Sequence, residues 1–187
     1  MTLVNVFKKL LIGRSFATEK GRIKLFGYMD WTLVPSWVFA EILQKEGEDN
    51  GAEFLYEQGK AQAKKVGKDL IKFMGIGKGG SWTALKAVTE ILEFIGFGKV
   101  QFFKRETESP DKYHWILHVT DNPVVEYANK KFGPKSLVCN WFMGVYAAHG
   151  EMEMGIKNAK IRENKCVCRG APYCEWETKW QKKGERT

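Results

Sequence analysis

The most constraining feature of this chain is a cysteine-rich segment close to its C-terminal end. Cys166, Cys168 and Cys174 place three thiols within nine residues. Glu163 adds a carboxylate just upstream, and Gly170 indicates a turn between the thiols. Thiols that lie together at a turn are suited to binding a soft metal ion, most commonly zinc. The segment therefore predicts a metal site at the end of a folded element.

The residues on both sides of this segment alternate between polar and apolar, over 156–161 and 173–178. A period of two is typical of β-strands, because successive side chains point to opposite faces. We therefore expect a β-hairpin with the thiols at its loop end.

The rest of the chain is predicted to be helical, with one further hairpin. Apolar periodicity indicates helices at 36–45, 51–74, 82–95, 121–131 and 137–149, with Gly47 and Gly150 ending the first and the last. Strands are expected at 22–28, 99–105 and 113–119. Two hairpins separated by helices predict an α+β fold, in which helices pack on one side of an antiparallel four-stranded sheet.

Small residues recur along the predicted helix 51–74. Gly59, Ala63 and Gly67 are spaced four residues apart, so they share one face of that helix. A face without large side chains would allow another helix to approach closely, including a helix from a second subunit.

The composition and the net charge of the chain exclude few classes of function. The chain is 44% apolar and 28% charged, which is typical of a globular protein, and its net charge is +8. A basic protein can bind nucleic acid or an anionic membrane, but no nucleic-acid recognition motif accompanies the charge, so we predict no nucleic-acid partner. Lysines recur every four residues on the helix 51–74, and we interpret them as a solvated face (Lys60, Lys64, Lys68 and Lys72).

Targeting and anchoring signals are not apparent in the sequence. The segment 3–12 is apolar with two internal lysines, too short to cross a bilayer, and is expected to be a helix packed on the domain, on a twin subunit or on a membrane surface. No other apolar run has transmembrane length. The segment 75–81 is glycine-rich but lacks the spacing of a phosphate-binding loop, so we expect a link between helices.

The four cysteines of the chain could form two disulfides or bind a metal. Three of them crowd together and no secretory signal precedes them, which favours reduced thiols in a cytoplasmic protein. The alternative is that Cys139 is a small buried apolar residue and that the other thiols are incidental.

The candidate ligands follow from the expected hairpin. Cys166 and Cys174 lie on the two sides of one turn, and Glu163 can reach the same point. Cys139, at the start of the preceding helix, completes a set of four ligands, and a closed set predicts a structural ion. Cys168 is the alternative to Glu163, because residues 166 and 168 of a strand face the same side.

The pattern of Glu163, Cys166, Gly170 and Cys174, followed by Trp176, resembles the C-terminal signature of the 4-vinyl reductase domain family. This family includes the sensory domains of phenol-responsive transcription activators and archaeal proteins described as hydrocarbon-binding. The resemblance implies the ligand-binding-domain fold of TRAPP subunits and nitric-oxide-signalling proteins. It divides the chain into a helical extension over 1–21, a 4-vinyl reductase-like ligand-binding domain over 22–180 and a tail over 181–187.

The resemblance also implies a ligand set, a pocket and an oligomer. In the phenol sensors, zinc is bound at the positions that match Cys139, Glu163, Cys166 and Cys174, and Cys168 is an additional thiol in this sequence. Family members bind small apolar molecules between the helices and the sheet, and they form dimers. Candidate lining residues, of types that are more often plain core, are Trp82, Trp115, His118, Trp141 and Phe142.

Three functions remain open from the sequence. The first is a module that binds a small apolar or aromatic molecule and acts as a sensor or carrier for a downstream signalling protein. The second is a dimeric adaptor, which would have a filled core and an exposed apolar patch. The third is an enzyme, which we do not favour, because no nucleotide-binding pattern and no catalytic histidine spacing is found.

Overall fold

The computed structural model describes residues 16–19, 22–25, 29–74, 82–105, 112–154 and 158–181. The chain separates into two compact units, Met1–Pro35 and Ser36–Thr187. In the first unit, the described residues form an antiparallel sheet of β1 (Phe16–Glu19), β2 (Arg22–Leu25) and β3 (Met29–Trp31). The predicted helix 3–12, the link 75–81 and residues 182–187 of the tail lie outside the described residues, and the predicted domain division stays a prediction.

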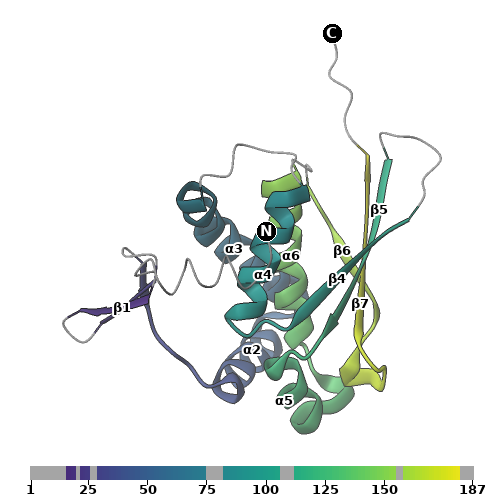
Figure 1. Ribbon diagram of the computed structural model, residues 1–187. Coiled ribbons are helices and arrows are strands. Elements are labelled where there is room, and N and C mark those ends of the chain that lie inside the picture. The colour runs from purple at the N-terminus through teal and green to yellow at the C-terminus, as the bar shows by residue number, and fades with distance from the viewer. Residues whose placement is uncertain are drawn as a thin grey trace. The chain divides into compact units, whose positions relative to one another are not determined.

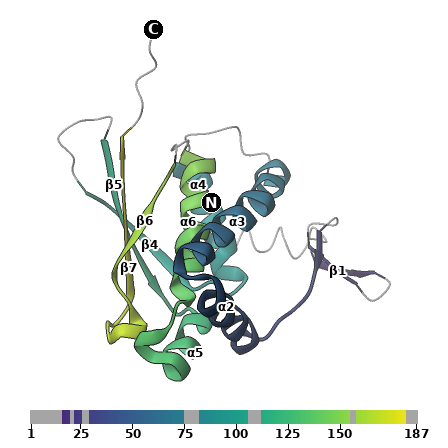
Figure 2. The same cartoon turned by 180° about the vertical axis from the view of Figure 1, so that it is seen from behind.

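The second unit has the predicted α+β architecture. Its elements are α2 (Ser36–Asn50), α3 (Ala52–Met74), α4 (Trp82–Phe94), β4 (Lys99–Arg105), β5 (Lys112–Thr120), α5 (Pro123–Phe132), η1 (Gly133–Lys135), α6 (Val138–Met154), β6 (Ile161–Lys165), η2 (Val167–Arg169) and β7 (Cys174–Gln181), where η marks a short 3-10 helix. The strands form one antiparallel sheet in the order β4-β5-β7-β6. The helices lie on one face of this sheet (Figures 1 and 2), so the predicted fold class is confirmed. None of the described helices is both long and apolar enough to cross a bilayer.

Helix α6 is the centre of the helical layer, and glycines set its distance from α3. A Cβ atom on Gly144 would lie 2.0 Å from the carbonyl oxygen of Tyr56, and one on Gly59 would lie 2.2 Å from that of Trp141. Both distances are far below van der Waals contact, so the two helices touch through their backbones. The small residues of α3 are therefore used within the chain rather than across a dimer.

Polar groups complete the contact of α3 with its neighbours. Lys60 and Lys64 bind the carboxylate of Glu151 on α6, at 2.8 and 2.5 Å. Lys60 also donates to the carbonyl oxygen of Ala159, at 3.2 Å, and the hydroxyl of Tyr56 donates to the same oxygen at 3.4 Å. Our interpretation of these lysines as a solvated face was wrong for Lys60, which is buried in the helix interface. Lys64 pairs with Glu151 but stays partly exposed.

Two predicted helix ends were wrong, because their glycines lie inside helices. Helix α2 continues past Gly47 to Asn50, and α6 continues past Gly150 to Met154. A Cβ on Gly47 would lie 2.6 Å from Cδ1 of Leu55, so this glycine lets α2 pack on α3. The break between α2 and α3 comes at Gly51, whose φ of 94° is in the region that favours glycine.

The first strand of the closing hairpin also begins later than expected. We predicted 156–161, whereas β6 spans Ile161–Lys165. Asn158 has a φ of 56°, which turns the chain before the strand, and pairing starts where Ile161 lies opposite Thr178. The alternation of side chains was present in the sequence, but because of this turn the strand begins five residues later than predicted, at Ile161 instead of residue 156.

We predict that Gly144→Ala destabilises the protein by about 1–3 kcal/mol, the usual cost of forcing extra atoms into a packed interior. The added methyl group must push α6 away from the backbone of α3. Chemical denaturation measures the loss. Lys65→Ala, at an exposed position of α3, is the control and should change stability by less than about 0.5 kcal/mol. An unaltered midpoint for Gly144→Ala would show that the contact is loose.

Candidate metal centre and adjoining cavity

Four side chains from separate elements converge where α6 begins. Cys139, Glu163, Cys166 and Cys174 each place one ligand atom within 4.8 Å of the other three. The sulfur of Cys139 lies 3.6 Å from that of Cys166 and 3.9 Å from that of Cys174. A tetrahedral zinc ion with bonds of about 2.3 Å to sulfur has sulfur–sulfur edges of about 3.8 Å. The spacing of the thiols therefore fits one tetrahedral ion.

The start of α6 is fixed by hydrogen bonds, so the position of Cys139 is fixed as well. The amide of Leu137 donates to the buried side chain of Gln44 on α2, at 2.9 Å. The hydroxyl of Ser136 accepts from the amide of Val138, at 3.4 Å, as a helix-capping residue does. Cys139 follows directly, with its thiol directed to the closing hairpin.

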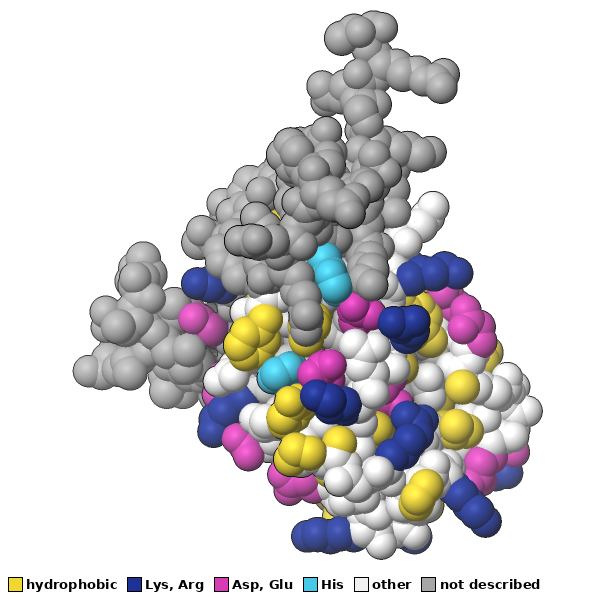
Figure 3. Space-filling view, turned by 90° about the vertical axis from the view of Figure 1, so that its right-hand side faces the viewer, with side chains coloured by type: hydrophobic (Ala, Val, Ile, Leu, Met, Phe, Trp, Pro, Cys, Tyr) yellow, Lys and Arg dark blue, Asp and Glu magenta, His cyan; other side chains and the backbone are white. Residues whose placement is uncertain are grey.

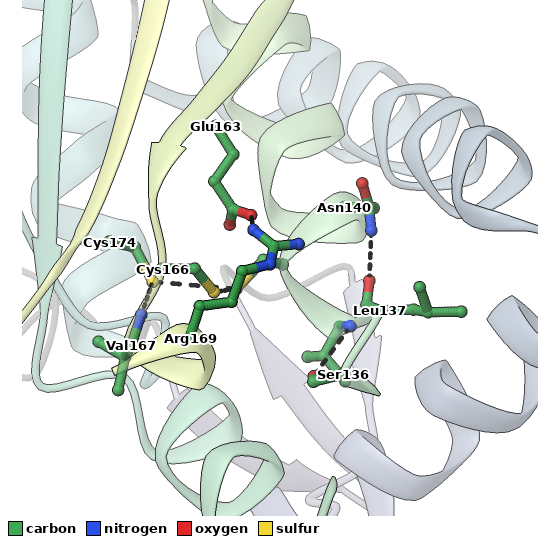
Figure 4. Close-up of polar contacts among 10 residues, drawn as sticks. Ser136, Leu137, Asn140, Glu163, Cys166, Val167, Arg169 and Cys174 are labelled. Carbon is green, nitrogen blue, oxygen red and sulfur yellow. Dashed lines mark hydrogen bonds and ion pairs between the residues drawn. The ribbon is translucent and has the colours of Figure 1, made fainter. Parts of the chain in front are cut away.

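The other three ligands come from the closing hairpin, which contains the predicted turn. Gly170 has a φ of 86°, and the amide of Ala171 donates to the carbonyl of Cys166 at 3.1 Å. The amide of Val167 lies 3.5 Å from the sulfur of Cys174 and can donate to it. Figure 4 shows Glu163 directed from β6 toward the sulfurs of Cys166 and Cys174.

Hydrogen bonds among the thiols shift their pKa values in opposite directions. Hydrogen bonds from Cys139, Cys168 and Cys174 lower the pKa of Cys166 far below its usual value. The same contact with Cys166 raises the pKa of Cys139. Burial, together with the charge on Cys166, raises the pKa of the Glu163 carboxyl. A bound cation would replace these protons, because metals bind thiolates and carboxylates in their deprotonated forms.

The carboxylate of Glu163 provides a second indication of an ion. Its Oε2 accepts a hydrogen bond from the guanidinium of Arg169. Its Oε1 is buried and has no hydrogen-bond partner. A buried polar atom without a partner is costly, and a cation among the sulfurs would satisfy it. Three thiolates and one carboxylate oxygen are a donor set that zinc accepts.

Cys168, the alternative ligand, lies beside this set and not in it. The four mutually close ligand atoms do not include its sulfur, which lies 3.9 Å from the carbonyl oxygen of Val125. All four cysteines are buried and free of disulfides. The structure thus brings together the four residues of the first choice, although the identity of the ligands stays a prediction.

A small apolar cavity lies between α6 and the sheet. Its volume is about 30 Å³, room for about one water molecule. Residues of α4, of α6 and of all four strands or the segments next to them form its wall. These residues are Leu85, Phe102, Trp115, Leu117, Tyr146, Ala147, Gly150, Met154, Ala159, Ile161 and Thr178. The hydroxyl groups of Tyr146 and Thr178 are buried, and neither has a hydrogen-bond partner. Burial raises the pKa of Tyr146, so this hydroxyl stays protonated.

The candidate pocket residues occupy different places. Trp115 lines the cavity. Trp141 and Phe142 lie in the core of the helical layer, where the ring of each meets that of Phe97 edge-on. The side chain of Trp82 lies outside the described residues.

His118 lies on the other face of the sheet. Its Nε2 is 3.1 Å from the carboxylate of Glu175, and its ring stacks on Tyr173 at 4.3 Å. Figure 3 shows this face, where acidic and basic side chains lie beside apolar ones and histidine side chains.

Tyr146 and Thr178 were not singled out from the sequence, although a signal for them existed. Thr178 continues the inward-facing alternation of Cys174 and Trp176 along β7. Tyr146 lies two helical turns after Cys139, on the same face of α6. What the sequence does not reveal is that both hydroxyls are left without a partner.

The comparisons with known proteins bear on the fold. No model of a protein family matches the chain, and no curated protein matches its sequence. A solved structure that is similar is described as the crystal structure of the phenol-responsive sensory domain of the transcription activator PoxR with phenol. The chain shares the fold of that domain. The TM-score is 0.63 at 16% identity, over 96% of this chain and 91% of that chain. Membership of the 4-vinyl reductase family, including its archaeal branch, stays a prediction.

We predict that Cys166→Ser and Cys174→Ser each abolish stoichiometric zinc binding and lower the unfolding free energy by several kcal/mol. The reason is that a structural zinc site contributes about 10–16 kcal/mol of binding free energy, which is coupled to folding. Elemental analysis by mass spectrometry and thermal unfolding measure both effects. Cys168→Ser is the matched control and should retain one ion per chain. Equal zinc content and equal melting in all three variants would contradict the predicted site.

Proposed function

We propose that the chain is a small-molecule-binding sensor domain whose fold is stabilised by a structural zinc ion. The observation that carries this proposal is the apolar cavity between α6 and the sheet, with the unpartnered hydroxyls of Tyr146 and Thr178 in its wall. Ligand sites in proteins are mostly apolar, with a few polar groups that orient the ligand. The cavity has this composition.

The chemistry of the wall selects a class of ligand. An apolar body would contact Leu85, Phe102 and Leu117, whereas one polar atom would satisfy the hydroxyls of Tyr146 and Thr178. A pure hydrocarbon would leave both hydroxyls without a partner, as they are in the free protein, whereas a ligand with a polar atom would gain about 1 kcal/mol for each hydrogen bond that it makes to them. We therefore propose an aromatic molecule with one hydroxyl or carbonyl group. The similar sensory domain is described as phenol-responsive, and phenol has this chemistry.

The size of the cavity adds a condition to the proposal. Its volume is about 30 Å³, whereas a cavity that binds benzene has about 150 Å³. Binding of phenol therefore requires the walls to separate. Met154 is a wall residue suited to this change, because methionine has flexible torsions and adapts to irregular space. Such a rearrangement on binding is also what a sensor needs in order to transmit the presence of its ligand.

The zinc ion would have a structural role in this function. Cys139, Glu163, Cys166 and Cys174 would fill all four positions of a tetrahedral ion, leaving none for a substrate. Reduced, buried thiols are compatible with the cytoplasm, where disulfides are rare. The response would pass to a downstream signalling protein through the surface of the domain.

A dimeric adaptor is the second candidate, and exposed apolar side chains favour it. Trp37, Ile42 and Phe54 are large apolar residues of α2 and α3 that lie exposed to solvent. Exposed large apolar side chains are characteristic of protein-binding surfaces when they form a patch. A homodimer in the sensor function would use the same helices, so the two candidates differ in the cavity and not in this surface.

Titration calorimetry with phenol and with toluene tests the ligand site. We expect wild-type protein to bind phenol more tightly than toluene, because only phenol can pair with a buried hydroxyl. Tyr146→Phe should weaken phenol binding about 3- to 10-fold, which corresponds to one hydrogen bond of about 1 kcal/mol. It should leave toluene binding unchanged and should not lower the folding stability, because the hydroxyl that it removes is buried without a partner in the free protein.

Tyr173→Phe removes a hydroxyl from the outer face of the sheet, where it pairs with Lys165, and is the matched control. Its affinity for phenol should equal that of the wild type. Absence of phenol and toluene binding at millimolar concentration would contradict the sensor proposal and favour the adaptor.

Light scattering after size-exclusion chromatography tests the proposed dimer. We expect twice the mass of one chain for the wild type and a shift toward the monomer for Trp37→Glu, because a charge cannot be buried in an apolar interface without a large cost. Glu57→Lys, at an exposed position of α3, controls for a general effect of charge. A monomeric wild type would remove the basis for the dimer.

A further inference from the structure

We propose that Arg169 is a positioning residue that selects Glu163, rather than Cys168, as the fourth ligand of the metal centre. The inference rests on the proposed structural metal and deepens it. It assigns a role to Arg169, which is not itself a ligand. It also gives a reason why Cys168 is not one of the four proposed ligands.

The centre offers more donors than a tetrahedral ion can use. Three thiols, from Cys139, Cys166 and Cys174, are common to both possible sets. The fourth position can be taken by the carboxylate of Glu163 or by the thiol of Cys168, which is buried beside them. On softness alone, a fourth thiolate would be at least as good a ligand for zinc as a carboxylate. Something in the protein must therefore favour Glu163.

The contact between Arg169 and Glu163 supplies this preference. The guanidinium donates to Oε2 of the carboxylate, which leaves Oε1 as the oxygen available to the ion. A ligand held by one oxygen in this way is oriented before the ion binds, as outer hydrogen bonds orient ligands at many metal sites. Figure 4 shows the guanidinium beside the carboxylate, on the hairpin that also carries Cys166.

The charge of Arg169 acts in the same direction. Each deprotonated ligand carries one negative charge, so a divalent ion bound by four of them leaves the centre negatively charged. The guanidinium lies next to Glu163 and offsets part of this excess. Arginine is suited to this place, because its planar donor group stays charged and matches the geometry of a carboxylate.

Cys168 lies ready as the replacement ligand, because its thiol is buried next to those of Cys139 and Cys166. Its contact with a group outside the cluster, the carbonyl of Val125 at 3.9 Å, is weak. It directly precedes Arg169 in η2, so a small rotation of this short helix moves both residues. Loss of the guanidinium would therefore free Glu163 and allow Cys168 to bind.

Cobalt(II) substituted into the purified, metal-stripped protein distinguishes the two ligand sets. Its thiolate charge-transfer absorption grows with each bound thiolate, and its visible bands move to longer wavelength. We expect a three-thiolate spectrum for the wild type and for Cys168→Ala. Arg169→Ala should give a four-thiolate spectrum and a higher affinity for cadmium relative to zinc, because cadmium is the softer ion. Arg169→Lys keeps the charge and should restore the wild-type spectrum in part.

The double variant Arg169→Ala with Cys168→Ala separates positioning from general stability. It lacks the replacement thiol, so we expect a three-thiolate spectrum with cobalt affinity reduced about tenfold or more, the lower end of outer-ligand effects. A merely structural role of Arg169 would lower stability in single and double variants without moving the bands. Identical spectra in the wild type and Arg169→Ala, or four thiolates in the wild type, would overturn the inference. Absence of cobalt binding by the wild type would instead overturn the metal centre itself.

Discussion

The convergence of Cys139 with Glu163, Cys166 and Cys174 is the contact on which the rest of the domain depends. It joins the first turn of α6 to both strands of the closing hairpin, so one site connects the helical layer with the sheet. The thiols are spaced as the corners of one tetrahedron, and an unpartnered carboxylate oxygen faces them. β6 is an edge strand with a single neighbour, so its attachment to α6 matters more than that of the central strands.

The cavity depends on the same two elements, because α6 and the closing hairpin supply much of its wall. Ile161 lines the cavity, and Glu163 lies two residues further along β6 with its side chain on the same face. The polar groups of the wall decide the chemistry that can enter. The two hydroxyls without partners are the reason that we propose a ligand with one hydrogen-bonding atom, within the predicted class of small apolar or aromatic molecules.

The closeness of Cys166 and Cys174 could be predicted because it is local: the two residues flank one turn, which Gly170 makes in a left-handed conformation. That the thiol of Cys139 also lies there depends on the packing of α6 on the hairpin, which sequence spacing does not reveal. The glycines show the limit of such reasoning. Gly51, with a φ of 94°, ends a helix, whereas Gly47 lies inside one, closely packed against Leu55 and Leu137. Contacts between distant residues decide the function of a glycine, and the sequence does not display them.

The same limit applies to the cavity. Aromatic residues such as Trp141 and Trp115 look alike in the sequence, yet only Trp115 lies at the cavity wall. Which side chain faces a cavity depends on how helices rotate on a sheet. That rotation is the sum of many packing contacts, and no single motif determines it.

The direct contact of α3 with α6 gives the domain a fixed internal dimension. Gly59 and Gly144 leave no space for even one added carbon, so the separation of the two helix axes is at its minimum. Helix α6 carries Cys139 at its beginning and Tyr146 along its length, and both would shift together if that separation grew. The absence of side chains at these two glycines therefore sets the spacing of the helical layer. In a variant with a wider gap between α3 and α6, every thiol and hydroxyl could be present, but those on α6 would lie displaced from the groups of the sheet that they face.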